Sequence, residues 1–193
     1  MAAENLPVYV GRVWMNGDPW LVADRADAEM WTGAEGDYER ILKLGTFETM
    51  VDVGAGTGLV LSSDYDDSTI EVFRVSPGEL LVVGVRYADD QPYAVLLADA
   101  VRVELETSGT ITVASGEVAI LASALPWRRG TVVREDPTQS PDQPRVPNEE
   151  ILVLSLEPGG YVLSERHVDR ESYGLVVWRL QHERSTSGWG DIR

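Results

Sequence analysis

Apolar and polar residues alternate along most of the chain after residue 46. A period of two is typical of strands with one buried face, and valine, isoleucine and leucine favour strands. Nine strands are predicted, reading FETMVDV, GLVLSS, STIEVFRV, ELLVVGVRY, TITVA, EVAILAS, EILVLSL, GYVLSE and YGLVVWRLQ. The pattern therefore predicts an α+β chain that is mainly β and built of antiparallel sheets.

The first 50 residues follow a different pattern. Residues 8–22 contain two apolar runs around the turn sequence Asn16–Pro19, which predicts a hairpin. Two short helical segments follow, at 24–33 and 37–45. Asp24 or Asp27 can cap the first segment, which ends at Gly33, and Asp37 can cap the second, which ends at Gly45. We expect a hairpin and one or two short N-terminal helices.

One later segment fits either a helix or a strand. In Pro92–Ala100 the preceding Asp90 can cap a helix with the proline in its first turn, whereas the valine and tyrosine residues suit a strand. We predict a helix here.

Two stretches beginning at Ile70 and Ile151 align without a gap, each around a Pro-Gly pair. A strand, a Pro-Gly turn and a returning strand are predicted in both, with glycine supplying the positive φ of a type II turn. The predicted organisation is a single domain over 1–193. It is divided into an N-terminal part at 1–50, β units at 51–106 and 110–182, a mobile proline-rich insertion at 126–148 and a polar tail at 183–193.

The stretch VDVGAGTG, residues 51–58, resembles the glycine loop of a nucleotide-binding unit such as that of S-adenosylmethionine-dependent methyltransferases. Such a loop needs a helix directly after its glycines, because the helix N-terminus holds the ligand. Here LVLSS follows, which is a strand pattern. We therefore predict that Gly54, Gly56 and Gly58 shape a turn or bulge between strands, and a methyltransferase-like enzyme remains the alternative.

Composition and net charge exclude several kinds of functional site and binding partner. The 193 residues carry a net charge of −16, from 32 acidic and 16 basic residues, with no cysteine and two histidines. Disulfides, thiolate nucleophiles, cysteine-based metal sites and a three-histidine zinc site are thereby excluded. The negative charge disfavours nucleic acid and anionic membranes and favours basic partners. With no visible signal peptide or membrane-length apolar run, a cytoplasmic location is expected.

No residue pattern predicts catalytic, cofactor-binding or metal-binding groups. No nucleophile pattern points to His167, and His182 is expected to be solvated at the end of a strand. The acidic run Asp64–Asp67 resembles a calcium loop in composition but lacks the further ligands, and it is interpreted as a solvated turn. Trp127, beside two arginines in the proline-rich insertion, is a candidate recognition residue.

Several short motifs together resemble the immunity protein 21 family of bacterial polymorphic-toxin systems. The matching stretches are VWMNGDPWLVAD, MWTG, GDYERI, VDVGAGTGLVLSSD, STIEVF and ELLVVGVRYADD. The positions that carry the resemblance are Trp14, Gly17, Pro19, Trp31, Gly33, Asp37, Tyr38, Gly54, Gly56, Val60, Leu61 and Asp64. The resemblance implies a cytoplasmic antitoxin that binds and blocks one toxin domain and has no catalytic residues.

Three hypotheses result: an inhibitory protein that binds a basic toxin, a cofactor-binding enzyme, and a scaffold domain that dimerises through an open sheet edge. For the first, exposure and charge indicate a set of candidate partner-binding residues. They are Glu35, Asp37, Asp64, Tyr65, Asp66, Asp67 and Trp127.

Overall fold

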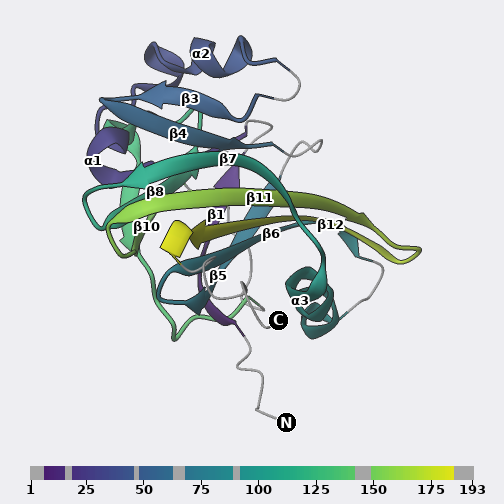
Figure 1. The fold of residues 1–193 in the computed structure, drawn as a ribbon. Helices are drawn as coiled ribbons and strands as arrows, with labels where there is room; N and C mark the ends of the chain where they lie inside the picture. The colour runs from purple at the N-terminus through teal and green to yellow at the C-terminus, as the bar shows by residue number, and fades with distance from the viewer. Residues whose placement is uncertain are drawn as a thin grey trace, which may run out of the picture.

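Two six-stranded sheets form the body of the protein in a computed structural model (Figure 1). The structure describes residues 7–15, 19–45, 48–62, 68–88, 92–141 and 149–184. Sheet A runs in the order β1 (Val8–Met15), β5 (Ser68–Ser76), β6 (Glu79–Ala88), β12 (Tyr173–His182), β11 (Gly159–Asp169) and β7 (Glu106–Val113). Sheet B runs in the order β3 (Met50–Val53), β4 (Gly56–Leu61), β2 (Trp20–Asp24), β8 (Glu117–Ala122), β10 (Glu150–Ser155) and β9 (Thr131–Arg134).

Short helices accompany the sheets. The helices are α1 (Arg25–Ala28), α2 (Tyr38–Leu42) and α3 (Tyr93–Arg102), and the 3-10 turns are η1 (Gly33–Glu35) and η2 (Trp127–Arg129). The predicted α+β, mainly β character is therefore confirmed, as are the short N-terminal helices and the helix predicted at Pro92–Ala100.

The main core lies where the inner faces of the two sheets meet. Trp20 of β2 and Trp178 of β12 are fully buried there, and their rings meet edge to face with centroids 6.1 Å apart. The outer faces are apolar as well. Under α3, sheet A contributes Phe73 and Leu81 to a second cluster, and sheet B packs against Trp31 and the short N-terminal helices in a third. Burial on both faces explains why the central strands read as nearly continuous apolar runs.

The predicted N-terminal hairpin is wrong, because its two strands belong to different sheets. β1 pairs with β5 at one edge of sheet A. β2 lies inside sheet B, where β4 and β8 bond its two sides. All five residues of β2 are buried, so this strand needs partners on both sides and cannot be one half of an isolated hairpin.

The two similar β units are also not both hairpins. β5 and β6 form the predicted antiparallel hairpin. In the second unit β10 pairs with β8 and β9 in sheet B, whereas β11 pairs with β7 and β12 in sheet A. The Pro158–Gly159 pair therefore carries the chain from one sheet to the other. The later half of the alignment differs too, since α3 corresponds to the strand β12.

The described part of the predicted insertion, residues 126–141, contains secondary structure. η2 is followed by β9, which pairs with β10 in parallel, so sheet B is mixed rather than wholly antiparallel. Beyond β9, the Glu135 carboxylate accepts from Arg74 at 2.7 Å and from the Ser155 backbone N–H at 3.1 Å. These contacts attach the segment to both sheets. Residues 142–148 and 185–193 lie outside the described residues, so the predicted mobility and tail there stay predictions.

Replacing Gly33 with alanine is expected to destabilise the region that joins η1 to η2. Gly33 has φ +51, and an added Cβ would lie 2.6 Å from Pro126 N and 2.7 Å from Leu125 C, which are backbone atoms. We expect a loss of about 2–4 kcal/mol in the free energy of unfolding, from strain plus overpacking. Urea denaturation measures it. Gly45→Ala is the control, because its added Cβ meets only the Glu48 side chain, no closer than 3.6 Å; equal losses in both variants contradict the prediction.

Candidate functional site

The glycine-rich stretch forms a tight link between two strands, as the sequence predicts. Gly54 and Ala55 make the turn between β3 and β4, and Gly54 has φ +57. Asp27 of α1 holds the turn, because its Oδ1 accepts a 2.9 Å hydrogen bond from Ala55 N. Gly58 lies inside β4 and does not precede a helix. The strand–loop–helix geometry of a nucleotide-binding unit is therefore not formed by these glycines.

A second aspartate, Asp24, joins α1 to the turn between β7 and β8. Its Oδ1 caps α1 by accepting from Ala26 N at 2.9 Å, as predicted for one of two candidate caps. Its Oδ2 accepts from Ser115 N at 2.7 Å. Asp24 is only 2 % exposed, so these two backbone hydrogen bonds stabilise a buried carboxylate.

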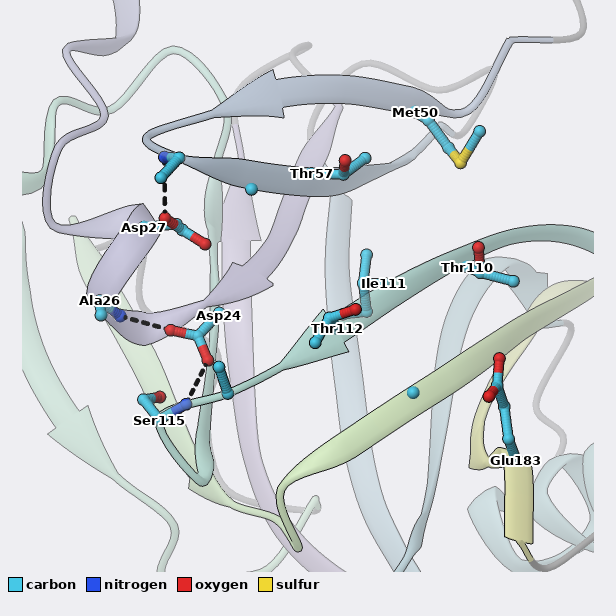
Figure 2. Close-up of a pocket in the computed structure, with 14 residues that line it drawn as sticks. Asp24, Ala26, Asp27, Met50, Thr57, Thr110, Ile111, Thr112, Ser115 and Glu183 are labelled. Carbon is cyan, nitrogen blue, oxygen red and sulfur yellow. Dashed lines mark hydrogen bonds between the residues drawn. The ribbon is translucent and has the colours of Figure 1, made fainter.

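These two aspartates line a groove of about 1100 Å³ that opens between the β3–β4 hairpin and β7 (Figure 2). Figure 2 shows α1 at one end, the hairpin along one side, and β7 with β11 along the other. The lining residues come from segments spread over most of the chain. They are Asp24, Ala26, Asp27, Met50, Ala55, Gly56, Thr57, Thr110, Ile111, Thr112, Ala114, Ser115, Gly160 and Glu183.

The charge of this groove is entirely negative. Asp24, Asp27 and Glu183 bring three carboxylates to its wall, and no arginine, lysine or histidine is among the lining residues that the structure describes. Threonine and serine residues, the exposed Met50 side chain, and alanine, glycine and isoleucine residues supply the rest of the lining. The arrangement is suited to positive charge and to an extended polar chain rather than to an anion.

Of the residues predicted to bind a partner, Glu35 and Trp127 are brought together. Glu35 forms ion pairs with Arg128 and with Arg129, the latter at 2.9 Å, so its charge is already balanced. Trp127 is half-buried against the outer cluster of sheet B, and its backbone N–H donates to Trp31 O at 3.0 Å. Both residues thus have structural contacts, and their role in binding stays a prediction.

Asp37 precedes α2, but its side chain does not cap that helix. Instead its Oδ2 accepts from the Thr32 backbone N–H at 2.9 Å and from the Thr32 hydroxyl at 2.7 Å, and its Oδ1 pairs with Arg40 at 3.1 Å. Partial burial opposes ionisation, but the Thr32 hydrogen bonds and Arg40 outweigh it and lower the pKa of Asp37. The other candidates, residues 64–67, lie outside the described residues.

The two histidines occupy different environments. His167 is exposed in a second hollow of about 590 Å³, next to the first half of β7. His182 ends β12 but is buried, so the predicted solvated side chain is wrong. Its ring lies edge to face against Tyr161 at 5.0 Å, and its Nδ1 accepts from Arg184 N at 3.1 Å. Within the described ranges, no cluster of three or more histidine, aspartate or glutamate residues is arranged to hold a metal ion.

A buried charged cluster lies on the outer face of sheet A. Glu71 of β5 is fully buried, and its Oε2 lies 3.7 Å from Nε of Arg12 on β1. The same Arg12 Nε donates to the Tyr9 hydroxyl at 2.9 Å. Burial and, next, the negative charge of Glu71 raise the pKa of Tyr9 to about 12, so this phenol is protonated at neutral pH.

Sequence reasoning missed the groove. Asp24 and Asp27 were expected only as helix caps, and Glu183 was placed in a polar tail. The groove residues come from β2, α1, the β3–β4 hairpin, β7, the turn between β7 and β8, β11 and the residues after β12. No spacing along the chain links these segments, because their proximity depends on which sheet each strand joins. The only local signal was the row of threonines around Thr110.

Comparison with known proteins finds no relative. Neither the protein-family models, nor the curated proteins, nor the solved structures include a match to this chain. Among the described residues, no helix has the length and apolar character needed to cross a membrane. What can be stated is therefore the class: a mostly β protein of two sheets, with an acidic groove beside one sheet edge.

Glu117→Gln is expected to destabilise the protein at neutral pH but not in acid. Hydrogen bonds from Arg134 and then Arg25 lower the pKa of Glu117 below its ordinary 4.5. A lowered folded-state pKa stabilises the fold above the unfolded-state pKa, and this stabilisation is lost as pH falls through the folded-state pKa. We expect a loss of about 0.5–1 kcal/mol at pH 7, since the pair is partly solvated.

Urea denaturation across a pH series measures this difference. The loss should begin to shrink near pH 4.5, where the carboxylate of the unfolded state protonates, and should disappear as pH falls through the lower pKa of the folded state. Glu171→Gln is the matched control, because Glu171 is exposed and has no ion pair in the described structure. A Glu117→Gln loss that does not change with pH would contradict the assignment.

Proposed function

We propose that this chain is a non-enzymatic immunity protein that binds and inhibits a basic toxin domain in the cytoplasm. The observation that carries the proposal is the surplus of sixteen negative charges. Such a surplus accelerates the encounter with a basic protein and disfavours association with acidic ones. The resemblance of MWTG, GDYERI and VDVGAGTGLVLSSD to the immunity protein 21 family supports the same function.

The distribution of charge also supports the proposal. The ion pairs of the described structure already use twelve different basic side chains, including Arg12, Arg74 and Arg179. Few cations are therefore available to oppose the surplus acids at the surface. The groove in Figure 2 is one place where carboxylates collect with no basic residue in the lining. A basic partner would find its complementary charge here.

Co-expression tests this function. The open reading frame next to the gene for this chain is expressed in a bacterial host from an inducible promoter, with and without this chain. We expect growth arrest alone and rescue by co-expression. The Gly33→Ala variant is the matched control, because it keeps every charge but has a less stable fold. It therefore separates an effect of charge alone from an effect of the folded surface. Lack of rescue by the wild-type chain, with both proteins present by immunoblot, contradicts the proposal.

A kinetic measurement tests the electrostatic part. The association rate of the purified pair should fall by at least about tenfold between roughly 0.05 and 0.5 M NaCl, because salt screens the attraction. The dissociation rate should change far less. An association rate that does not respond to salt would show that the charge of −16 has no part in recognition.

A further inference from the structure

We propose that the outer edge of β7, over Gly109–Val113, accepts an extended segment of the basic partner as an added strand, with the groove carboxylates binding its basic side chains. This inference rests on the proposed function, since the partner is taken to be the inhibited domain. It adds the surface, the mode of binding and the chemistry of the bound segment.

The first support is the open edge. β7 is the last strand of sheet A and pairs only with β11. In the described structure, the hydrogen bond on its other side comes from a side chain, the Thr49 hydroxyl donating to Ser108 O, and Gly109 lies against the side chains of Leu59 and Met50. Successive residues of a strand direct their backbone groups to alternate sides, so part of the N–H and C=O groups of β7 faces outward. Such an edge is a template for another strand.

The usable length of the edge is set by a bulge. The register with β11 shifts between Gly109 and Thr107, which leaves Ser108 as the extra residue on β7. Because Thr49 also bonds to Ser108 O, the edge is interrupted at this point. The remaining run, Gly109–Val113, is about 16 Å long at roughly 3.3 Å per residue. This is enough for a short added strand.

The second support is the space beside the edge. Thr110, Ile111 and Thr112 of β7 line the groove of about 1100 Å³, so this part of the edge opens into a hollow, whereas Gly109 is packed against the β3–β4 hairpin. Figure 2 shows the β3–β4 hairpin opposite, with Met50 and Thr57 on it. Met50 is 49 % exposed, and a flexible thioether adapts to different partner side chains.

The third support is charge. Asp27 uses Oδ1 to hold Ala55 N, and no hydrogen bond to its Oδ2 is recorded within the described residues, so this oxygen can accept from a partner cation. Asp24 and Glu183 add negative charge at the two ends of the groove (Figure 2). The bound segment should therefore carry arginine or lysine.

The same charges argue against a second copy of this chain as the occupant. Pairing β7 with β7 of another molecule would bring both sets of Asp24, Asp27 and Glu183 close together, and each molecule carries −16. Like charges in such proximity oppose the contact. A basic segment of a different protein would instead be attracted by these carboxylates.

A peptide titration tests the edge without the toxin. The full ¹⁵N-labelled chain is titrated with a capped hexapeptide of alternating arginine and valine. We expect slower amide exchange and shift changes centred on Gly109–Val113. A fully N-methylated version keeps the charge but lacks backbone donors, and it should bind at least about tenfold more weakly. Equal binding of the two peptides, or changes centred elsewhere, would overturn strand addition.

Variants of the edge supply the matched comparison. Thr110→Lys and Thr112→Lys place positive charge on exposed positions of β7, whereas Thr131→Lys makes the same change on β9, the edge strand of sheet B. Lysine is well tolerated on edge strands, so all three variants should fold. We expect the first two to weaken hexapeptide binding by about tenfold or more and the third by less than about twofold.

Two further results separate the edge site from the proposed function. If the neighbouring gene product is neutralised equally well by the β7 and β9 variants, the edge site is wrong and the inhibitory function stands. If the hexapeptide protects Gly109–Val113 but no toxin is neutralised, the inhibitory function fails and the edge site stands. Concentration-dependent dimerisation that Thr110→Lys abolishes would assign the edge to a second copy and overturn the proposal.

Discussion

Truncating Trp178 to alanine is expected to lower the free energy of unfolding by about 3–5 kcal/mol, the range for removing a large aromatic from a packed core. Trp178 lies fully buried on β12 and contacts Trp20 of β2 edge to face at 6.1 Å. It therefore joins sheet A to sheet B, and its loss leaves a cavity between them. Urea denaturation followed by far-UV circular dichroism measures the change.

Trp178→Phe is the matched control for this prediction. The indole N–H of Trp178 has no hydrogen-bond partner among the described residues, so phenylalanine loses volume but no recorded hydrogen bond. We expect its loss to be less than half that of the alanine variant. Similar losses for the two variants would show that the aromatic ring does not fill this core.

Replacing Arg12 with methionine is expected to cost about 3–5 kcal/mol, because it removes one partner of a buried ion pair and leaves the other charge buried. The Glu71 side chain has no exposed surface, and Arg12 is 15 % exposed. Arg12 also donates to Ser140 O at 3.1 Å, which attaches the segment after β9 to sheet A. The Tyr9 hydroxyl then remains beside the Glu71 carboxylate.

The double variant Arg12→Met/Glu71→Met distinguishes loss of the charge pair from loss of packing. With both charges removed we expect a cost of less than about 1.5 kcal/mol, since a buried ion pair can often be replaced by apolar groups at little cost. Arg166→Met is the surface comparison, because its 3.0 Å pair with Glu106 is exposed, and it should cost less than about 1 kcal/mol. A double variant as unstable as the single one would refute this account.

Both substitutions change contacts that stabilise the two sheets, and the packing of these sheets positions the groove. The groove lies where an edge of sheet A approaches the β3–β4 hairpin of sheet B, so its shape depends on how the sheets pack. Trp178 acts between the sheets, and Arg12 with Glu71 acts on the outer face of sheet A, away from β7. The affinity of a folded Trp178→Phe variant for the partner therefore measures how strongly binding in the groove depends on the relative position of the two sheets.

The sequence by itself determined the local structure. Period-two runs located most of the strands, although not β9, and the helix predicted at Pro92–Ala100 became α3, with Pro92 as its N-cap residue rather than in its first turn. The pattern directly after Gly58 predicted a strand where a nucleotide loop needs a helix, and Gly54 takes the positive φ of a tight turn. These features depend on neighbouring residues and on backbone sterics, which a short stretch of sequence specifies.

Only the tertiary structure decided which strands pair and where the groove forms. Alternation defines the two faces of a strand but not its neighbours, so β1 and β2 read as a hairpin although each joins a different sheet. β10 and β11 likewise read as a hairpin, although each joins a different sheet. Asp27, Thr110 and Glu183 converge only after both sheets have assembled, because burial of apolar faces from distant segments sets that arrangement.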